Sequence, residues 1–286
     1  MTAGNTRARK LPPTDIIKPT VKVSIIVPIY KQEKTIKKDL ENIAHVMSQT
    51  RWDFELIGVV DGSPDNSFEE AKKLKDPHIK IYGYEHNKGK GYAIRYGMAR
   101  ASGEYISFID AGMDIDPNGI SMLLEHMEWY DADIIVGSKK HPASQINYHV
   151  IRQLYSCIYH LLVRILFGLK LKDTQTGLKV FKRNVMEKVL PRLLVKQFAL
   201  DVEILAVAKK LGFDRIYEAP VKINLDEGNS SFSLFPLFDK GIQKMVIDTL
   251  AIFYRLNILG YYNDASKRKW IYDKDLDMRV NTGELG

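Results

Sequence analysis

Residues Val21–Ile29 read VKVSIIVPI, and the polar residues Tyr30–Glu33 follow directly. The run is β-rich and nearly continuous in apolar residues, which is typical of a parallel strand buried on both faces. Pro28 lies near its end, where a strand can lose a backbone hydrogen-bond donor. The sequence therefore predicts a buried strand with polar side chains at its carboxyl end.

Further apolar strands follow this one, and helical segments separate them. Strands are expected at Phe54–Val60, Ile79–Tyr84, Tyr105–Ile109 and Asp133–Gly137. Strands that alternate with helices of about 10 to 15 residues build right-handed βαβ units. The sequence therefore predicts an α/β fold with a mostly parallel central sheet.

Polar motifs stand just after three of the predicted strands. They are Tyr30–Glu33, Asp61–Asp65 and Asp110–Asp114. In open parallel sheets, ligands bind beyond the carboxyl ends of the strands. This placement predicts a nucleotide-binding or catalytic site at that edge of the sheet.

The pattern changes after Ser138. We expect a long amphipathic helix at Tyr148–Phe167 and a loop with a short strand at Asp173–Phe181. Helices are expected at Asn184–Leu190 and Leu200–Leu211, and a strand at Arg215–Ile223. We divide the chain into a disordered leader (1–20), the α/β domain (21–228), an amphipathic segment (229–263) and a loosely ordered polar tail (264–286).

Composition narrows the function classes. Lys and Arg outnumber Asp and Glu by 42 to 35, a net charge of +7 that suits a polyanionic ligand such as a nucleotide diphosphate or simply aids solubility. The chain lacks the dense basic blocks of a nucleic-acid-binding arm, so nucleic acid is not an expected partner. Cys157 is the single cysteine, which excludes a disulfide framework within the chain and fits a reducing, cytoplasmic compartment.

No apolar stretch reaches the roughly 18 residues of a membrane span. Ile158–Leu171 and Ile242–Tyr262 come nearest, and charged residues interrupt both. Amphipathic segments of this kind can lie on a membrane surface. For 229–263, an interfacial segment, an ordinary packed helix and a contact with a separate membrane subunit all remain open.

Two motifs could bind a charged ligand. The first is Asp110-Ala111-Gly112-Met113-Asp114, whose carboxylates could coordinate Mg²⁺ or Mn²⁺. It could also be an ordinary turn. Asn87–Gly91 could present backbone amides and lysines to a phosphate, or it could be a solvated turn. Asp61 could meet a nucleobase or ribose, or cap the next helix.

The motifs in order resemble the family-2 inverting glycosyltransferases, and most of all the branch of dolichol-phosphate mannose synthase and bacterial polyprenol-phosphate glycosyltransferases. The resemblance covers about Val21 to Ile223. It is carried by VSIIVPIYKQE, VVDGSPDNS, HNKGKGYAIRYGM, GEYISFIDAGMDIDP, DIIVGSK, DTQTGLKVFKR and FALDVEILAVAKKLGFDRIYEAPV.

The resemblance implies a GT-A type, Rossmann-like nucleotide-sugar-binding fold. The residues expected around the nucleotide sugar are Pro28, Tyr30, Glu33, Asp61, Lys90, Asp110 and Ala111. Asp110 and Asp114 would hold the divalent metal. In the mannose synthases the metal pattern is D-x-D-x-Q, whereas this chain has Gly112 at the middle position and Asp114 at the last.

The resemblance also implies an acceptor site for the phosphate of a polyprenyl phosphate. The residues expected there are Ser138, Lys139, Arg152, Ser156, Thr176 and Lys179. Lys139 stands where the branch has arginine. The positive charge is kept, but the paired hydrogen bonds that a guanidinium can donate to a phosphate are lost. Asp226–Ser231 lacks the basic residue that the branch has in this later segment, which weakens the assignment to mannose synthases in particular.

The implied reaction is an in-line displacement at the anomeric carbon with inversion. A lipid phosphate is already an anion, so it needs positioning and charge neutralisation but no general base. A sugar hydroxyl, as in polysaccharide or glycolipid synthesis, needs a base, and Asp201 is the best candidate. A third alternative is a non-catalytic nucleotide-sugar-binding protein, which the loss of the central carboxylate at Gly112 would fit.

Overall fold

The computed structural model describes residues 21–144, 150–196, 199–223, 240–263 and 270–281. The strands are β1 Lys22–Ile29, β2 Asp53–Asp61, β3 Ile79–Tyr84, β4 Tyr105–Ile109, β5 Ile134–Ser138, β6 Leu178–Lys182, β7 Ile216–Pro220, β8 Ile271–Asp273 and β9 Met278–Val280. The α-helices are α1 Ile36–Ser48, α2 Ser67–Lys72, α3 Lys90–Met98, α4 Asn118–Trp129, α5 Val150–Phe167, α6 Arg183–Val189, α7 Leu200–Lys210 and α8 Lys240–Phe253. A short 3-10 turn, η1, spans Leu190–Arg192, and a π-helical turn, η3, spans Tyr254–Ile258.

Seven strands form the central sheet in the order β3-β2-β1-β4-β6-β5-β7. β6 runs antiparallel to both of its neighbours, and the other pairs are parallel. The mostly parallel sheet was predicted from the sequence. The reversed strand matters for the site, because it brings the residues that precede β6 to the edge where β1, β2 and β4 end.

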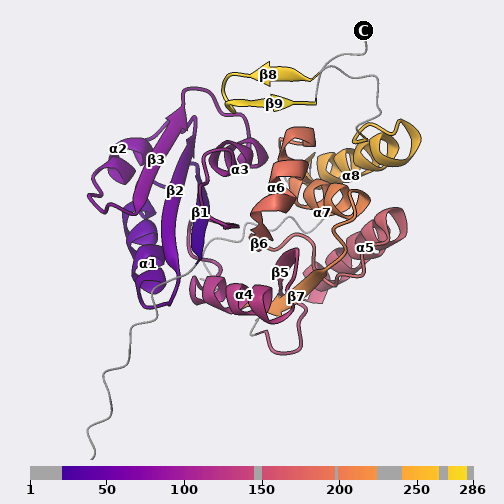
Figure 1. Cartoon of the computed structure of the whole chain (residues 1–286), viewed down its shortest axis with the longest axis horizontal. Helices are drawn as coiled ribbons and strands as arrows, with labels where there is room; N and C mark the ends of the chain where they lie inside the picture. Colours follow the sequence, from indigo (N-terminus) through magenta and orange to yellow (C-terminus); the bar gives the residue numbers. More distant parts are fainter. Residues whose placement is uncertain (1–20, 145–149, 197–198, 224–239, 264–269, 282–286) are drawn as a thin grey trace, which may run out of the picture.

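Helices cover both faces of the sheet (Figure 1). α1, α2 and α4 pack on one face, against the alternate β1 residues Val23, Ile25, Val27 and Ile29. α3 and α5 to α8 pack on the other face, where Ile26 and Phe108 point. The alternation of β1 side chains between two apolar layers explains why its sequence is apolar almost throughout.

The segment after residue 263 differs from the prediction. The loosely ordered tail expected at 264–286 instead contains the β8–β9 hairpin, whose Leu276 and Val280 are each 1% exposed. The missed signal is the spacing of Leu276, Met278 and Val280, which alternate with polar residues as a strand does. Residues 1–20 and 229–239 lie outside the described part, so the expected leader and the first part of the amphipathic segment stay predictions.

Candidate active site

The site is centred on Asp110, the residue that follows β4. Its neighbour Ile109 pairs with Leu178 of antiparallel β6, which places Gly177 beside Asp110. A Cβ on Gly177 would lie 2.2 Å from Asp110 Oδ2, so a larger residue would force the Asp110 side chain or the loop to shift. Glycine lets the loop before β6 approach the Asp110 carboxylate without that shift. Asp110, expected at the donor, therefore lies beside the residue that follows Thr176, which is expected at the acceptor.

Lys90 supplies positive charge to the same carboxylate. Its Nζ lies 2.7 Å from Asp110 Oδ2, and it starts helix α3 directly after Gly89, which has a φ of 96°. Burial alone would lower the pKa of Lys90, but the carboxylates of Asp110 and Asp201 raise it above its ordinary value. Lys90 is therefore a cation at the position where a diphosphate would meet Asp110.

The other oxygen of the Asp110 carboxylate, Oδ1, has a different environment. It is buried and has no hydrogen-bond partner among the described residues. Gly112 has a φ of 92°, and the direction of its missing side chain is open, with Gln32 Nε2 the nearest atom at 3.9 Å. Asp114 is exposed on the same loop. Within the described residues, no three His, Cys, Asp or Glu side chains gather as a metal site.

Mg²⁺ is commonly held by one or two carboxylates together with phosphate oxygens of the substrate. The unpartnered Asp110 oxygen fits that donor set, with Asp114 as the second carboxylate on the loop. A site of this kind would be completed by the substrate, because the described residues alone offer too few ligands.

The expected nucleotide pocket lies along the ends of β1 and β2. Pro28 is half-buried near the end of β1, and Tyr30 beyond it is 42% exposed. Glu33 Oε2 accepts a hydrogen bond from Asn66 N at 3.2 Å, which ties the loop after β1 to the loop after β2. Ala111 packs at the rim of the core on the α1 side.

Asp61 at the end of β2 is surrounded by donors from its own chain. Its carboxylate accepts from Lys88 N at 2.7 Å, Gly89 N at 3.0 Å and Tyr84 Oη at 2.9 Å. Asn87 Nδ2 adds a contact at 3.2 Å. In this structure Asp61 therefore anchors the loop before α3, and a contact with a nucleobase stays a prediction.

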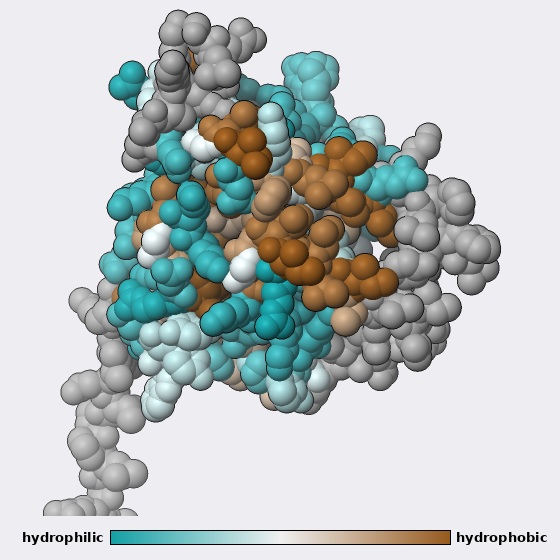
Figure 2. Space-filling view, turned by 90° about the vertical axis from the view of Figure 1, so that its right-hand side faces the viewer, coloured by the Kyte–Doolittle hydropathy of each residue, from teal (hydrophilic) through white to brown (hydrophobic). Residues whose placement is uncertain are grey.

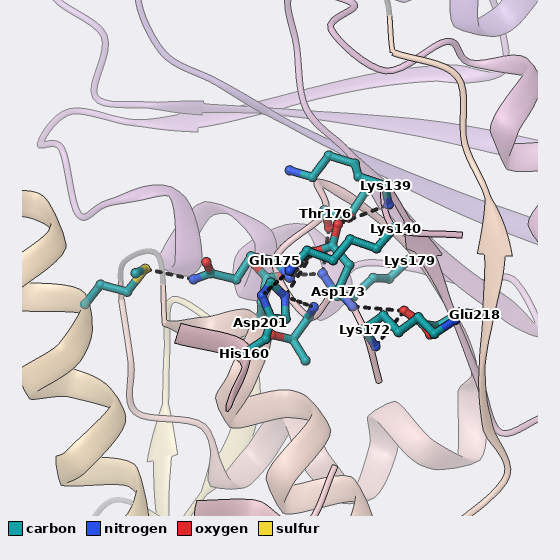
Figure 3. A network of polar contacts seen from close by, with 12 residues as sticks. Lys139, Lys140, His160, Lys172, Asp173, Gln175, Thr176, Lys179, Asp201 and Glu218 are labelled. Carbon is teal, nitrogen blue, oxygen red and sulfur yellow. Dashed lines mark hydrogen bonds and ion pairs between the residues drawn. The ribbon is translucent and has the colours of Figure 1, made fainter. Parts of the chain in front are cut away.

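Two of the residues expected at the acceptor phosphate, Lys139 and Thr176, contact Asp173 (Figure 3). Its carboxylate accepts from Thr176 Oγ1 at 2.6 Å and from Lys139 N at 3.1 Å. Burial would raise the pKa of Asp173, but His160, Lys139 and Thr176 hold it well below its usual range. Ser138 is fully buried, and its Oγ has no hydrogen-bond partner among the described residues. Asp173 therefore fixes the backbone of the loop between Lys139 and Thr176.

His160 of α5 is a site residue that sequence reasoning missed. Its Nε2 lies 3.2 Å from Thr174 N and 3.6 Å from Asp173 Oδ1, and its Nδ1 lies 3.2 Å from Lys140 Nζ (Figure 3). Lys140 was likewise not predicted. The signal available was a histidine that interrupts an otherwise mostly apolar run of α5. Arg152 and Ser156 lie on the same helix, but their side chains fall outside the described part of the structure.

Lys179 and Asp201 form a buried ion pair beneath this loop. Their Nζ and Oδ1 atoms are 2.6 Å apart, and Lys179 Nζ also donates to the Thr176 carbonyl at 2.6 Å. Lys179 is 0% exposed and Asp201 is 7% exposed. The expected acceptor contact of Lys179 is untested, and its burial favours support of the loop from below.

Glu203, two residues further along α7, has a different environment. It is fully buried and accepts from Leu194 N, Val195 N and Tyr262 Oη. Burial raises the pKa of Glu203 despite these hydrogen bonds. Its contacts join α7 to the segment after α8, so Glu203 holds the framework and not the reacting atoms.

Comparisons with known proteins identify similar sequences. The sequence model of glycosyl transferase family 2 matches residues 24–190. The chain is 30% identical to a dolichyl-phosphate beta-glucosyltransferase of Trichomonas vaginalis, over 84% of this chain and 76% of that one. It is 28% identical to the Saccharomyces cerevisiae protein of the same name, over 86% and 78% of the two chains.

Solved structures show the same fold at low sequence identity. Glucosyl-3-phosphoglycerate synthase from Mycobacterium tuberculosis, solved with Mn²⁺ and UDP-glucose, matches with a TM-score of 0.62 at 18% identity, over 96% of this chain and 94% of that one. Mannosyl-3-phosphoglycerate synthase from Rubrobacter xylanophilus matches with a TM-score of 0.61 at 17% identity, over 86% and 79%. The predicted GT-A type fold is confirmed.

Proposed function

The chain belongs to glycosyl transferase family 2, and we propose that this glycosyltransferase moves a hexose from a nucleotide diphosphate sugar to a polyprenyl or dolichyl phosphate. The observation that carries the proposal is the contact between Asp110 and Gly177. It joins the carboxylate expected at the donor diphosphate to the loop expected at the acceptor phosphate. Relatives named as dolichyl-phosphate beta-glucosyltransferases make glucose the first sugar to test.

In the proposed donor site, the nucleotide lies along the ends of β1 and β2, between Tyr30 and the loop that Asp61 anchors. The diphosphate lies beside the Lys90–Asp110 ion pair, whose Nζ and Oδ2 atoms are 2.7 Å apart. Either UDP or GDP could be the nucleotide. Pro28, Glu33 and Ala111 shape the pocket.

In the proposed acceptor site, the lipid phosphate lies against Lys139, with Arg152 and Ser156 on α5 as further contacts. Ser138 and Thr176 are fully buried and support the site from within the protein. Lys179 supports the loop at Thr176 and does not contact the phosphate, because its ammonium is buried and bound to Asp201. Positive charge near the phosphate offsets the repulsion between an anionic acceptor and an anionic leaving group.

The proposed step forms one bond and breaks one. An oxygen of the acceptor phosphate attacks the anomeric carbon, the bond from that carbon to the diphosphate breaks, and the nucleoside diphosphate leaves from the opposite face with the electron pair. The configuration therefore inverts, and no proton has to be removed. A divalent cation held by Asp110 and Asp114 would neutralise the leaving diphosphate. Lys90 stabilises the same charge and aligns the diphosphate.

A membrane surface is the partner that a polyprenyl acceptor requires. None of the described helices has the length and apolar content needed to cross a bilayer. Two neighbouring helices do carry exposed apolar stripes, which we call the α5–α8 face and which Figure 2 shows as a hydrophobic patch. The face consists of Ile158, Leu161 and Ile165 on α5 and Ile247, Leu250, Tyr254, Ile258 and Leu259 on α8 and the turn after it.

The α5–α8 face is continuous with the acceptor loop. His160 of α5 contacts Thr174, and Met245 Sδ of α8 accepts from Gln175 Nε2 at 2.8 Å. The exposed Arg164 on α5, Lys244 on α8 and Lys170 just after α5 match anionic lipid. We propose that this face, together with the segment 229–263, rests on the cytoplasmic leaflet and brings the acceptor phosphate to the site. A separate membrane subunit is the alternative occupant.

The function is tested by a transfer assay with purified protein and a short-chain polyprenyl phosphate. Radiolabelled UDP- and GDP-sugars are supplied with and without Mn²⁺. We expect a labelled, organic-soluble product that Asp110→Ala abolishes. Donor binding without such a product would contradict the proposal and lead to sugar-hydroxyl acceptors, and binding with no turnover on any acceptor would indicate a non-catalytic protein.

Membrane docking needs its own variants. Ile165 is 71% exposed and Ile247 is 64% exposed, so Ile165→Glu with Ile247→Glu should abolish co-sedimentation with anionic vesicles while turnover of the short-chain acceptor is retained. Trp129→Glu on α4 is the matched control, because Trp129 is 84% exposed and lies away from the face. Unchanged sedimentation of the double variant would exclude the α5–α8 face.

A further inference from the structure

The β8–β9 hairpin packs against the helix that begins in the donor site. Figure 1 shows it beside α3, and its buried Leu276 and Val280 cluster with Tyr92 of that helix. Asn281 N, just after β9, donates to the Pro191 carbonyl at 2.8 Å. The hairpin is therefore fixed to the body of the domain on two sides.

The turn of the hairpin presents Asp275 to the loop before α3. Asp275 Oδ2 lies 2.7 Å from Lys88 Nζ and accepts from Tyr92 Oη at 3.1 Å. The Asp275 carbonyl accepts from Arg100 Nη2 at 2.9 Å, which holds the turn against the far end of α3. The bonds from Lys88 and Tyr92 lower the pKa of Asp275.

The contacts continue from Lys88 to the proposed donor residues. Lys88 N binds Asp61 at 2.7 Å, and the Lys88 ammonium lies over the rings of Tyr84 and Tyr92 at 5.4 and 4.5 Å from their centroids. Lys90, two residues on, binds Asp110. Residues 88–90 thus contact the hairpin, Asp61 and the carboxylate at the proposed diphosphate position.

We infer that Asp275 is a positioning residue for the nucleotide-sugar donor, acting through Lys88 on the loop that Asp61 and Lys90 share. The inference rests on the proposed function, because it takes that loop as the donor site. The Lys88 ammonium is bound to Asp275 and Tyr92. Lys88 therefore fixes the loop and does not contact the diphosphate. The hairpin is then part of the donor site although it follows the catalytic domain in sequence.

The test compares substitutions at Asp275 with a control on the same hairpin. Asp275→Lys removes the pair with Lys88 and adds a like charge, so the KM for the donor and the Kd of the nucleoside diphosphate should rise about three- to ten-fold. The kcat and the KM for the acceptor should stay within about two-fold of the wild type. Asp277→Asn is the control, because the Asp277 carboxylate bonds Tyr272 within the hairpin.

A charge swap separates positioning from general damage to the fold. Lys88→Asp combined with Asp275→Lys restores the pair with reversed polarity, so donor affinity should recover to within about two-fold of the wild type. Failure of the swap to restore affinity, or unchanged nucleotide binding in Asp275→Lys, would overturn the inference. A wild-type protein that binds no nucleotide sugar would instead overturn the proposed function.

Discussion

The Asp201→Asn variant tests both the buried ion pair and the identity of the acceptor. The substitution keeps an oxygen near Lys179 but removes the negative charge. The Lys179 ammonium is 0% exposed and would retain the Thr176 carbonyl at 2.6 Å as its close partner. Removing one member of a buried pair costs about 3–5 kcal/mol, because the remaining charge stays out of water. For a chain of this size that loss corresponds to a fall in Tm of roughly 6–20 °C.

The effect on catalysis depends on what the acceptor is. A phosphate acceptor has no proton to lose, so the folded variant should keep its kcat within about tenfold of the wild type. A hydroxyl acceptor needs a base, and loss of general base catalysis would lower kcat by about 10²–10⁴. Calorimetric melting gives the stability, and the transfer assay, run well below the Tm of the variant, gives kcat.

A second buried carboxylate provides the control. Asp133 is 6% exposed and pairs with Arg215 at 3.0 Å, at the opposite end of β5 from Ser138. Asp133→Asn should destabilise the protein without changing kcat. A Tm for Asp201→Asn equal to that of the wild type would refute the buried-pair reasoning. A hundredfold loss of kcat in a folded Asp201→Asn protein would refute the lipid-phosphate mechanism.

Three other substitutions have defined outcomes. Gly177→Ala should displace the Asp110 carboxylate, since the added Cβ would lie 2.2 Å from Oδ2, and donor affinity in the presence of Mn²⁺, measured by titration calorimetry, should fall. Lys140→Met should raise the KM for polyprenyl phosphate, because the Lys140 ammonium contacts His160 beside the acceptor loop. The KM for the donor should stay unchanged in the same steady-state assays. Equal changes in the two KM values would contradict this expectation. Glu55→Gln should lower the free energy of unfolding at pH 7, measured with urea. Burial would raise the pKa of Glu55, but bonds from Lys80, Ser24 and Ser102 lower it from 4.5 to about 2, so the gap between wild type and variant should narrow as the pH falls from 4.5 towards 2.

The sequence was enough to predict the framework of the site. Apolar runs such as VKVSIIVPI are long and unambiguous, so the parallel strands and the polar residues at their ends could be placed without a structure. Asp110, Lys90, Lys139 and Thr176 do gather at that edge. Their roles rest on the resemblance and on the proposals above.

The sequence was not enough where the outcome depends on partners that are distant along the chain. The direction of β6 is set by its pairing with β4 and β5, and nothing in LKVFK specifies it. The burial of Lys179 depends on Asp201, 22 residues later. His160 looked like an interruption of an apolar helix until the fold placed it against Thr174. The hairpin turn at Asp275 pairs with Lys88, 187 residues earlier.

The reversed strand β6 restricts which insertions and deletions the chain can accept. Lys179 and Phe181 point to the face that α7 covers, and Leu178 and Val180 point to the opposite face. Removing one residue between Gly177 and Lys182 would exchange these two sets, because side chains alternate along a strand. The ammonium would then enter the apolar layer beneath α1 and α4, and leucine or valine would face Asp201. Changes of length in homologous sequences should therefore avoid this strand and accumulate in the connections on either side of it.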